Sequence, residues 1–307
     1  MSRQALLSPA RLHSIKPPTP ADRAPTVASR AELEQLLVDD VPYGDLTTDA
    51  LGIGAAAGSM AFTARDMMVL ALAEDAAAII ELTGCRVELH AASGTALEQG
   101  MPILTAHGPA SALLRSWKVA QTLIEIWSGV ATDARAIVDA AKAVAPDIAV
   151  ACTRKNVPGT KRFAVAAVKA GGAVMHRLGL SESVLVFPEH RAFLGKEPFV
   201  GLVERLKRAA PEKKLVIEVT TVETAVVAAA VGFDVIQAEK FTPAEIASLV
   251  ARMATSSARS RPLIAAAGGI HAGNVAAYAQ AGADVVVTSS PYLACPRDVK
   301  VRIGPSC

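Results

Sequence analysis

The second half of the sequence alternates short apolar runs with longer helical stretches, and this alternation constrains the fold more than any other feature. The runs expected to form strands are 148–153, 183–187, 214–219, 233–239, 262–268 and 283–289. The stretches expected to form helices are 161–169, 199–209, 222–231, 243–253 and 272–281. Strands that alternate with helices of about ten residues are typical of βαβ units, which form a parallel sheet with right-handed connections.

The number of predicted strands limits the architecture that this sheet can form. About six or seven parallel strands are enough for a sheet that closes, or nearly closes, into a barrel. The segments GFDVIQ (232–237) and GADVVV (282–287) both place Gly-x-Asp-Val after a helix, which supports repeated βα units. We therefore predict an α/β barrel, with a doubly wound open sheet as the alternative.

The residues before this alternation mix short strands with helices, which is typical of an α+β unit. The expected strands are 60–71 (with a break at Arg65-Asp66), 87–91 and 97–108, and the expected helices are 31–38, 74–83, 111–127 and 132–144. The last two helices are predicted to be separate because Ser128-Gly129 lies between them. The predicted organisation is a disordered leader or appended tail (1–28), an N-terminal domain (29–129) and a barrel domain (130–290), with a return of residues 291–307 to the N-terminal domain left open.

Charge and composition exclude several kinds of partner. The net charge is only +2, so no chain-wide attraction to nucleic acid or to a membrane surface is expected. The most apolar stretch, 67–82, contains three acidic residues and is too short to span a bilayer, and no signal peptide is recognised. The four cysteines form no CxxC pair, which is typical of reduced thiols and predicts a cytoplasmic protein.

Candidate site residues follow the predicted strands, because ligands of parallel α/β proteins meet the C-terminal ends of the strands. The polar groups found there are Thr153, Arg154, Lys155, Glu218, Glu239, Lys240, Gly268, Gly269, Thr288, Ser289 and Ser290, and two further candidates, His176 and Arg177, lie in the segment before the second predicted strand. Cations that converge on one barrel mouth repel each other unless an anion joins them. Each group also has an ordinary structural interpretation, such as a solvated charge pair at Arg154-Lys155 or a salt-bridged rim at Glu239-Lys240.

The chemistry of these strand ends indicates a phosphorylated ligand with a bound metal. Glu218 and Glu239 end two consecutive strands, and paired carboxylates suit Mg²⁺, which prefers oxygen ligands. The Gly-Gly and Thr-Ser-Ser segments offer backbone N–H groups and hydroxyls at helix starts, which suits a terminal phosphate. The set as a whole predicts a site for a polyanion such as a sugar pyrophosphate.

Several motifs also resemble those of one known family. They are DDVPYGDLTT (39–48), SGVAT (128–132), TRKNVPGTK (153–161), HRLGL (176–180), IEV (217–219) and AGGI (267–270). Over about residues 31–300 the chain resembles the nicotinate-nucleotide pyrophosphorylase family, also called quinolinate phosphoribosyltransferases. The segment VFPEHR (186–191) is similar to the family's ModD branch, which is associated with molybdate transport.

This resemblance implies a fold and a reaction. It implies an N-terminal α/β sandwich domain, an open seven-stranded parallel α/β barrel and a homodimer. It also implies a pentosyltransferase that uses Mg²⁺ and 5-phosphoribosyl-1-pyrophosphate (PRPP). A ring nitrogen of an N-heterocyclic acid attacks C1 of the ribose, and pyrophosphate leaves.

The resemblance assigns roles to individual residues of this sequence. Arg154, Lys155, His176 and Arg177 match residues that bind the substrate carboxylate and the pyrophosphate, and Gly268, Gly269 and Ser289 fall in the 5-phosphate loops. Glu218 and Glu239 match carboxylates that face the ribose and the metal, with Glu239 standing where the family has Asp. The residues expected to act in catalysis are Glu218, Glu239 and Lys155.

Two positions depart from the family pattern. Lys118 stands where the family has an arginine supplied across the dimer interface, and Phe187 stands where it has a second lysine. We expect both residues to contact substrate, and we expect an acceptor other than quinolinate because a cation is missing. Two alternatives remain open: a Schiff-base lyase that uses Lys155 or Lys240, and a non-catalytic sensor of a phosphorylated ligand or of molybdate.

Overall fold

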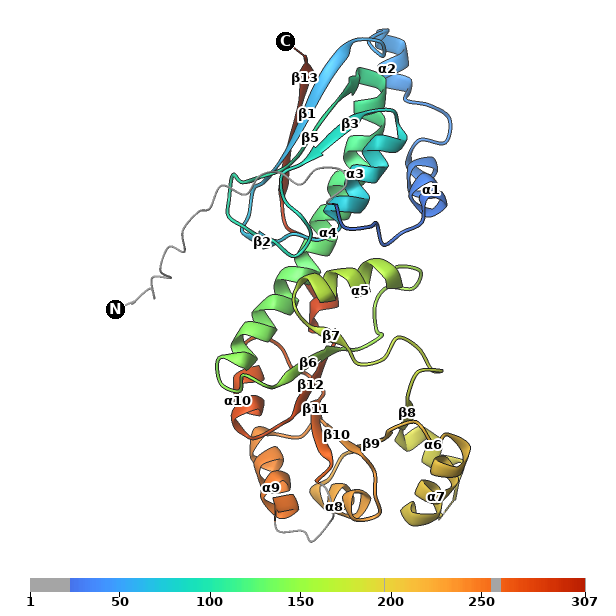
Figure 1. Cartoon of the computed structure of the whole chain (residues 1–307), viewed down its shortest axis with the longest axis vertical. Coiled ribbons are helices and arrows are strands. Elements are labelled where there is room, and N and C mark those ends of the chain that lie inside the picture. Colours follow the sequence, from blue (N-terminus) through green and yellow to red (C-terminus); the bar gives the residue numbers. More distant parts are fainter. Residues whose placement is uncertain (1–22, 196, 255–260, 307) are drawn as a thin grey trace, which may run out of the picture.

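The computed structural model describes residues 23–195, 197–254 and 261–306, which form two regions stacked along the long axis of the molecule (Figure 1). The elements of the first region are α1 (Arg30–Asp40), α2 (Leu46–Leu51), β1 (Ala57–Ala64), β2 (Met68–Val69), α3 (Ala73–Leu82), β3 (Arg86–Leu89), β4 (Ala96–Leu97), β5 (Pro102–Pro109), α4 (Ala110–Lys142) and, from the C-terminus, β13 (Val299–Pro305). Its main sheet is antiparallel, with the strand order β13-β1-β5-β3. Buried and less buried positions alternate along β1, as expected when helices cover only one face of a sheet.

The second region is a parallel half-barrel. Its elements are β6 (Ala149–Cys152), α5 (Lys161–Ala170), β7 (Val174–Met175), β8 (Val184–Val186), α6 (Pro188–Ala192), α7 (Phe199–Ala209), β9 (Leu215–Val219), α8 (Val222–Ala230), β10 (Val235–Glu239), α9 (Pro243–Ala254), β11 (Leu263–Ala267), α10 (Val275–Gln280), β12 (Val285–Thr288) and the 3-10 helix η2 (Ser290–Leu293). Seven strands pair in the order β7-β6-β12-β11-β10-β9-β8, all parallel.

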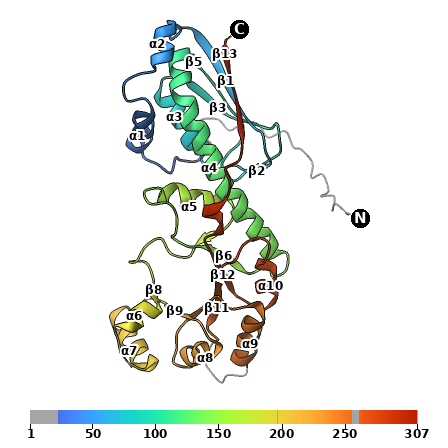
Figure 2. The same ribbon diagram turned by 180° about the vertical axis from the view of Figure 1, so that it is seen from behind.

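The order of the strands shows that this sheet does not close. The strands β7 and β8 follow each other in the chain but lie at opposite edges of the sheet. The helices α8, α9 and α10 lie on the outer side of the curled sheet in both views (Figures 1 and 2). The prediction of an α/β protein with an open, seven-stranded parallel barrel is therefore confirmed, and the doubly wound sheet is not what forms.

The predicted break in the long helix is wrong. The helix α4 runs without interruption through 33 residues and connects the two regions. A Cβ atom at Gly129 would lie 2.4 Å from the carbonyl oxygen of Cys295, so glycine is needed there for a close approach of the returning chain rather than for a bend. Ser128 and Thr132 accept the N–H groups of Ala71 and Val69, and they thereby hold the β2 segment against α4.

The segment that precedes α1 is held against α3. Buried Asp75 accepts hydrogen bonds from the N–H groups of Val27 and Ala28, and Arg23 forms an ion pair with Glu81. These contacts involve the last part of the predicted leader, whereas residues 1–22 lie outside the described residues. Within the described ranges, no helix combines the length and the apolar character needed to cross a membrane.

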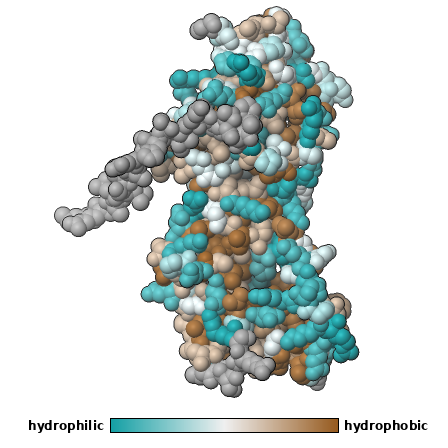
Figure 3. All heavy atoms as spheres, in the orientation of Figure 1, coloured by the Kyte–Doolittle hydropathy of each residue, from teal (hydrophilic) through white to brown (hydrophobic). Residues whose placement is uncertain are grey.

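Neither the surface nor the described cysteines indicate a second reactive site. Hydrophobic residues gather over the half-barrel on the face shown in Figure 3, and hydrophilic residues border them. Cys85, Cys152 and Cys295 are free. Burial raises the pKa of the Cys152 thiol to about 12, so this thiol stays protonated at neutral pH and is a poor nucleophile.

Candidate active site

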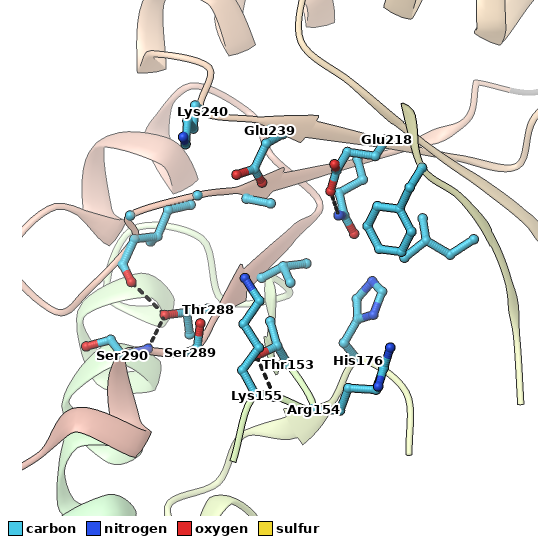
Figure 4. A pocket seen from close by; sticks show the side chains of 18 of the residues that line it. Thr153, Arg154, Lys155, His176, Glu218, Glu239, Lys240, Thr288, Ser289 and Ser290 are labelled. Atoms are coloured by element: carbon cyan, nitrogen blue, oxygen red, sulfur yellow. Dashed lines mark hydrogen bonds between the residues drawn. The ribbon is translucent and has the colours of Figure 1, made fainter. Parts of the chain in front are cut away.

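A cavity of about 960 Å³ opens at the C-terminal ends of the half-barrel strands (Figure 4). The predicted site residues that line it are Arg154, Lys155, His176, Arg177, Phe187, Glu218, Glu239, Gly268, Gly269 and Ser289. The structure thus brings together every predicted site residue except Lys118. The strand-end rule worked here because all seven strands are parallel, so their C-terminal ends share one edge.

The curl of the sheet brings its two edges together at the rim of the cavity. The guanidinium of Arg177, which follows β7, lies 5.5 Å from the ring centroid of Phe187, which follows β8. Arg177 is buried, and its pKa is lowered by burial and by the nearby Arg154 guanidinium. In the described part of the chain neither arginine forms a salt bridge, so this end of the cavity holds two close positive charges that an anion would stabilise.

Two glutamates and a glutamine form the centre of the cavity floor. Glu218 on β9 pairs in register with Gln237 on β10, whose Nε2 donates to Glu218 Oε2 at 2.7 Å, and Glu239 follows two residues later on β10. Burial raises the pKa of Glu218; the Glu239 and Glu189 carboxylates raise it further, whereas the hydrogen bond from Gln237 and the charge of Lys155 lower it. Both predicted carboxylates therefore face one cavity, and Glu218 has an environment that favours a nearby cation.

Gln237 is a site residue that the sequence prediction missed. It is 5% exposed, and within the described residues its Oε1 atom forms no hydrogen bond of normal geometry, although it faces His176 closely enough to oppose the lowering of the His176 pKa. A polar side chain in the buried strand VIQAE, two residues before Glu239, was the available signal, since alternate residues of a strand share one face.

The donor atoms around Gln237 fit a magnesium ion. The carboxylates of Glu218 and Glu239 and the unpaired carbonyl oxygen of Gln237 are hard oxygen ligands. Within the ranges that the structure describes, no group of three or more His, Cys, Asp or Glu residues is placed to hold a metal by itself. This donor set suits Mg²⁺, which usually takes one or two carboxylates together with substrate phosphates.

Gly268 and Gly269 follow β11 with positive φ angles of 92° and 71°. A Cβ atom at Gly268 would lie 2.8 Å from Cγ of Lys240 and 3.0 Å from Oε1 of Glu239, so only glycine lets these side chains pack across the end of β11. The adjacent β12 loop is fixed by Thr288, whose hydroxyl donates to the carbonyl of Ile270 and accepts the N–H of Ser290. This wall of the cavity is held by hydrogen bonds before any ligand arrives.

The surroundings of the His176 ring disfavour its charged form. Burial and the charge of Arg177 lower its pKa, although Gln237 and Glu182 oppose the shift. The ring is therefore neutral at pH 7 and can offer one N–H as a hydrogen-bond donor rather than a positive charge.

The rim near β8 carries two more residues that the prediction missed, Glu189 and His190, both in the VFPEHR segment. The ring of His190 stacks on that of Phe187, with centroids 5.8 Å apart and planes at 22°. Nδ1 of His190 also accepts the N–H of Phe187, which fixes the start of α6. The rim therefore offers a flat aromatic surface with a carboxylate beside it.

Lys118 lies outside this cavity. It is on α4, where its ammonium donates to Gln121 Oε1 at 2.9 Å and lies 3.9 Å from the ring centroid of Trp117. It borders a separate groove of about 370 Å³ between α1 and α4. The contact of Lys118 with the site of a partner subunit stays a prediction.

Comparison with known proteins extends over both regions of the chain. Residues 45–128 match the model of the quinolinate phosphoribosyl transferase N-terminal domain, and residues 130–302 match that of the C-terminal domain. A Rhodobacter capsulatus protein named "Putative pyrophosphorylase ModD" is 48% identical over 244 residues, covering 80% of this chain and 93% of its own length. The nicotinate-nucleotide pyrophosphorylase [carboxylating] of Mycobacterium leprae is 31% identical over 201 residues, covering 64% and 69%.

Solved structures show the same fold. The structure of NadC from Streptococcus pyogenes superposes with a TM-score of 0.82 and covers 90% of this chain and 96% of its own, at 24% identity. The nicotinate-nucleotide pyrophosphorylase of Francisella tularensis gives a TM-score of 0.79 with 90% and 95% coverage, at 19% identity. The arrangement of half-barrel and antiparallel sheet is thus shared with these enzymes.

Proposed function

Because the chain belongs to the quinolinate phosphoribosyltransferase family, whose members are pentosyltransferases, we propose that it transfers the 5-phosphoribosyl group of PRPP to a ring nitrogen of an N-heterocyclic acid. The observation that carries this proposal is the cavity itself. It places Arg154, Lys155 and Arg177 around one space whose floor is formed by Glu218 and Glu239. A donor with phosphates at both ends of a ribose matches such an arrangement of charges.

The proposed chemistry needs no covalent nucleophile from the protein. The ring nitrogen donates its lone pair to C1 of the ribose, and the C1–O bond breaks with its electron pair leaving on the pyrophosphate. Glu218 and Glu239 offset the positive charge that develops on the sugar, while Arg154 and Lys155 stabilise the departing anion. Mg²⁺ held by the two glutamates and Gln237 would neutralise part of the pyrophosphate charge.

We propose that the acceptor carries fewer acidic groups than quinolinate, or places them differently. Phe187 and His190 form an aromatic surface at the rim, and the family resemblance places a lysine at position 187. The carboxylate of Glu189 is close enough to Glu218 to raise its pKa, so this end of the cavity already holds negative charge. Arg177 and Arg154 can pair with one acceptor carboxylate at this end, but a second carboxylate beside Glu189 would lack the lysine that the family has at position 187, which is unfavourable when the group is buried.

Assembly and biological setting are also proposals. Family membership supports a homodimer in which Lys118 reaches the cavity of the partner subunit, and the reduced cysteines support a cytoplasmic location. The resemblance of the VFPEHR segment to the ModD branch is the basis for proposing a link to molybdate metabolism. No nucleic acid or membrane partner is proposed, since the net charge is only +2.

A screen of N-heterocyclic acids with PRPP and Mg²⁺, read out as pyrophosphate release, tests the proposed reaction. Release that depends on both the acceptor and PRPP is the expected result. Tight PRPP binding without pyrophosphate release, whichever acceptor is added, would contradict the proposed reaction and favour a non-catalytic sensor. Borohydride trapping of a carbonyl substrate on Lys155 or Lys240 would favour a Schiff-base lyase instead.

A further inference from the structure

Lys240, the residue that follows β10, has an unusual backbone conformation. Among the described residues, two that are not glycine have φ in the left-handed region: Leu72 at 58° and Lys240 at 60°. Leu72 is 2% exposed and packs in the hydrophobic core, which compensates for its conformation. Lys240 is exposed and buries no such surface. A strained conformation without compensating packing, at the end of a strand that bears a site residue, points to a functional role.

The surroundings hold Lys240 in this conformation and direct its side chain along the cavity wall. Its N–H donates to the carbonyl of Ala267 at 2.8 Å, which ties it to the end of β11. Its side chain passes directly beside Gly268, where a Cβ atom would come within 2.8 Å of Lys240 Cγ. The absence of a side chain at Gly268 and the left-handed turn at Lys240 are therefore two parts of one arrangement.

The ammonium of Lys240 has no anionic partner among the described residues. Within the described ranges it takes part in no salt bridge or side-chain hydrogen bond, although it lines the cavity. An exposed lysine without a partner is ordinary on a protein surface. A lysine held in a strained conformation at the wall of a cavity is unusual, because glycine at that position would relieve the strain.

The position of Lys240 indicates which phosphate it would meet. The strands β10, β11 and β12 are neighbours in the sheet, so Lys240, the Gly268-Gly269 pair and Ser289 form one continuous wall. In Figure 4, Lys240 lies on the same side as Ser289 and Ser290, whereas Arg154 and His176 lie on the opposite side. Glu239 lies between Lys240 and Glu218 in this view, and Glu218 lies on the side of His176.

We propose that Lys240 binds the ester phosphate at C5 of the phosphoribosyl donor, together with the loops that follow β11 and β12. This inference rests on the proposed function, since it assumes a ribosyl donor with a phosphate at each end. A compact ammonium suits a terminal phosphate dianion, to which it donates without the fixed geometry of a guanidinium. Lys240 thereby selects donors that carry the 5-phosphate over unphosphorylated ones.

Calorimetry with two probes, ribose 5-phosphate and inorganic pyrophosphate with Mg²⁺, tests this assignment on the full chain. Lys240→Gly should weaken ribose 5-phosphate binding about tenfold or more, the effect of one charge-assisted hydrogen bond, and change pyrophosphate binding less than about twofold. Lys240→Arg should retain most of the affinity. The matched control is Lys214→Gly, since Lys214 is exposed next to the opposite end of β9; it should change neither affinity.

The thermal midpoint of Lys240→Gly separates ligand binding from folding. Glycine accepts the left-handed conformation without strain, so the midpoint should equal or exceed that of the wild type. Unchanged ribose 5-phosphate affinity in Lys240→Gly, with a wild type that binds the probe, would overturn the inference while leaving the proposed function intact. A larger loss for pyrophosphate would overturn the assignment to C5. A wild type that binds neither PRPP nor ribose 5-phosphate would overturn both proposals.

Discussion

The two sides of the cavity are lined by different kinds of chemical groups. On the side of β10, β11 and β12, the wall consists of glycines, hydroxyls and backbone groups that are fixed by internal hydrogen bonds, with the Lys240 side chain beside them. On the side of β7 and β8, it consists of the Arg177 guanidinium, the Phe187 and His190 rings and the Glu189 carboxylate, which come from the two open edges of the sheet. Backbone in the middle of a sheet is hard to vary, whereas side chains at its edges can be exchanged. We infer that the first side recognises the 5-phosphate end of the donor, whereas the second side faces the acceptor and the pyrophosphate end of the donor.

The largest expected effect lies on the acceptor side. The wild type should use quinolinate poorly, and Phe187→Lys should raise its kcat/KM for quinolinate more than about a hundredfold, because a partner for a buried carboxylate is worth about 3–5 kcal/mol. Steady-state kinetics measure the change. Phe193→Lys is the matched control, since Phe193 is 91% exposed near the same helix and does not line the cavity. Efficient wild-type turnover of quinolinate would show that Phe187 does not set the specificity.

The next effect lies on the donor side. Gly268→Ala places a Cβ atom against Lys240 at a φ of 92°, so the loop after β11 and the Lys240 side chain must move to relieve a strain of about 2 kcal/mol, and we expect this displacement to weaken ribose 5-phosphate binding by up to about thirtyfold. Gly52→Ala is a suitable control because Gly52 also has a positive φ, 64°, but no atom lies within 4 Å of its Cβ position. The control should lose stability without losing affinity. Equal affinity in Gly268→Ala and wild type would mean that this wall is not a phosphate site.

Replacing Arg154 or Arg177 should reduce ligand affinity by a smaller factor. Arg154→Ala and Arg177→Ala should each weaken PRPP binding at least about tenfold, because each removes a charge-assisted contact to an anion. Calorimetry with PRPP and Mg²⁺ provides the measurement, and Arg208→Ala, an exposed arginine on α7, is the control. Wild-type affinity in both variants would remove the idea that the β6 and β7 ends hold donor or acceptor anions.

The smallest expected effect is a shift in pH dependence. Burial raises the pKa of Glu218, and the Glu239 and Glu189 carboxylates add to this, against Lys155. Since the proposed mechanism needs Glu218 ionised, activity should be lost as the pH falls through this raised pKa, earlier than for an ordinary glutamate. Glu189→Gln removes one of the repelling charges and should move the acid limb of kcat/KM to lower pH by less than about one unit. A shift to higher pH would contradict this account.

The difference between the two sides also explains what could be predicted from the sequence. The alternation of strands and helices predicts the parallel sheet, and the strand-end rule then found lining residues that follow β6, β9, β10, β11 and β12, whereas Phe187 came from the family resemblance and Glu189 and His190 were missed. The rule could not show that the backbone of Lys240 is in the left-handed region. It also could not show that the Gln237 amide lies beside Glu218 and Glu239. Both features depend on how neighbouring strands align. Short elements such as β7 and α6 have too few residues for a periodic pattern. The glycine at 129 was misinterpreted because a single sequence does not reveal that Cys295 packs against it.

The measurement that tests the central claim most directly is pyrophosphate formation followed by phosphorus NMR in the presence of PRPP, Mg²⁺ and paired acceptors that differ only in one carboxylate. The account predicts acceptor-dependent release that is faster with the monocarboxylate and is abolished by Glu218→Gln. Release that is fastest with the dicarboxylate would contradict the division between the two sides. The absence of acceptor-dependent release, together with intact PRPP binding, would contradict the transfer reaction itself.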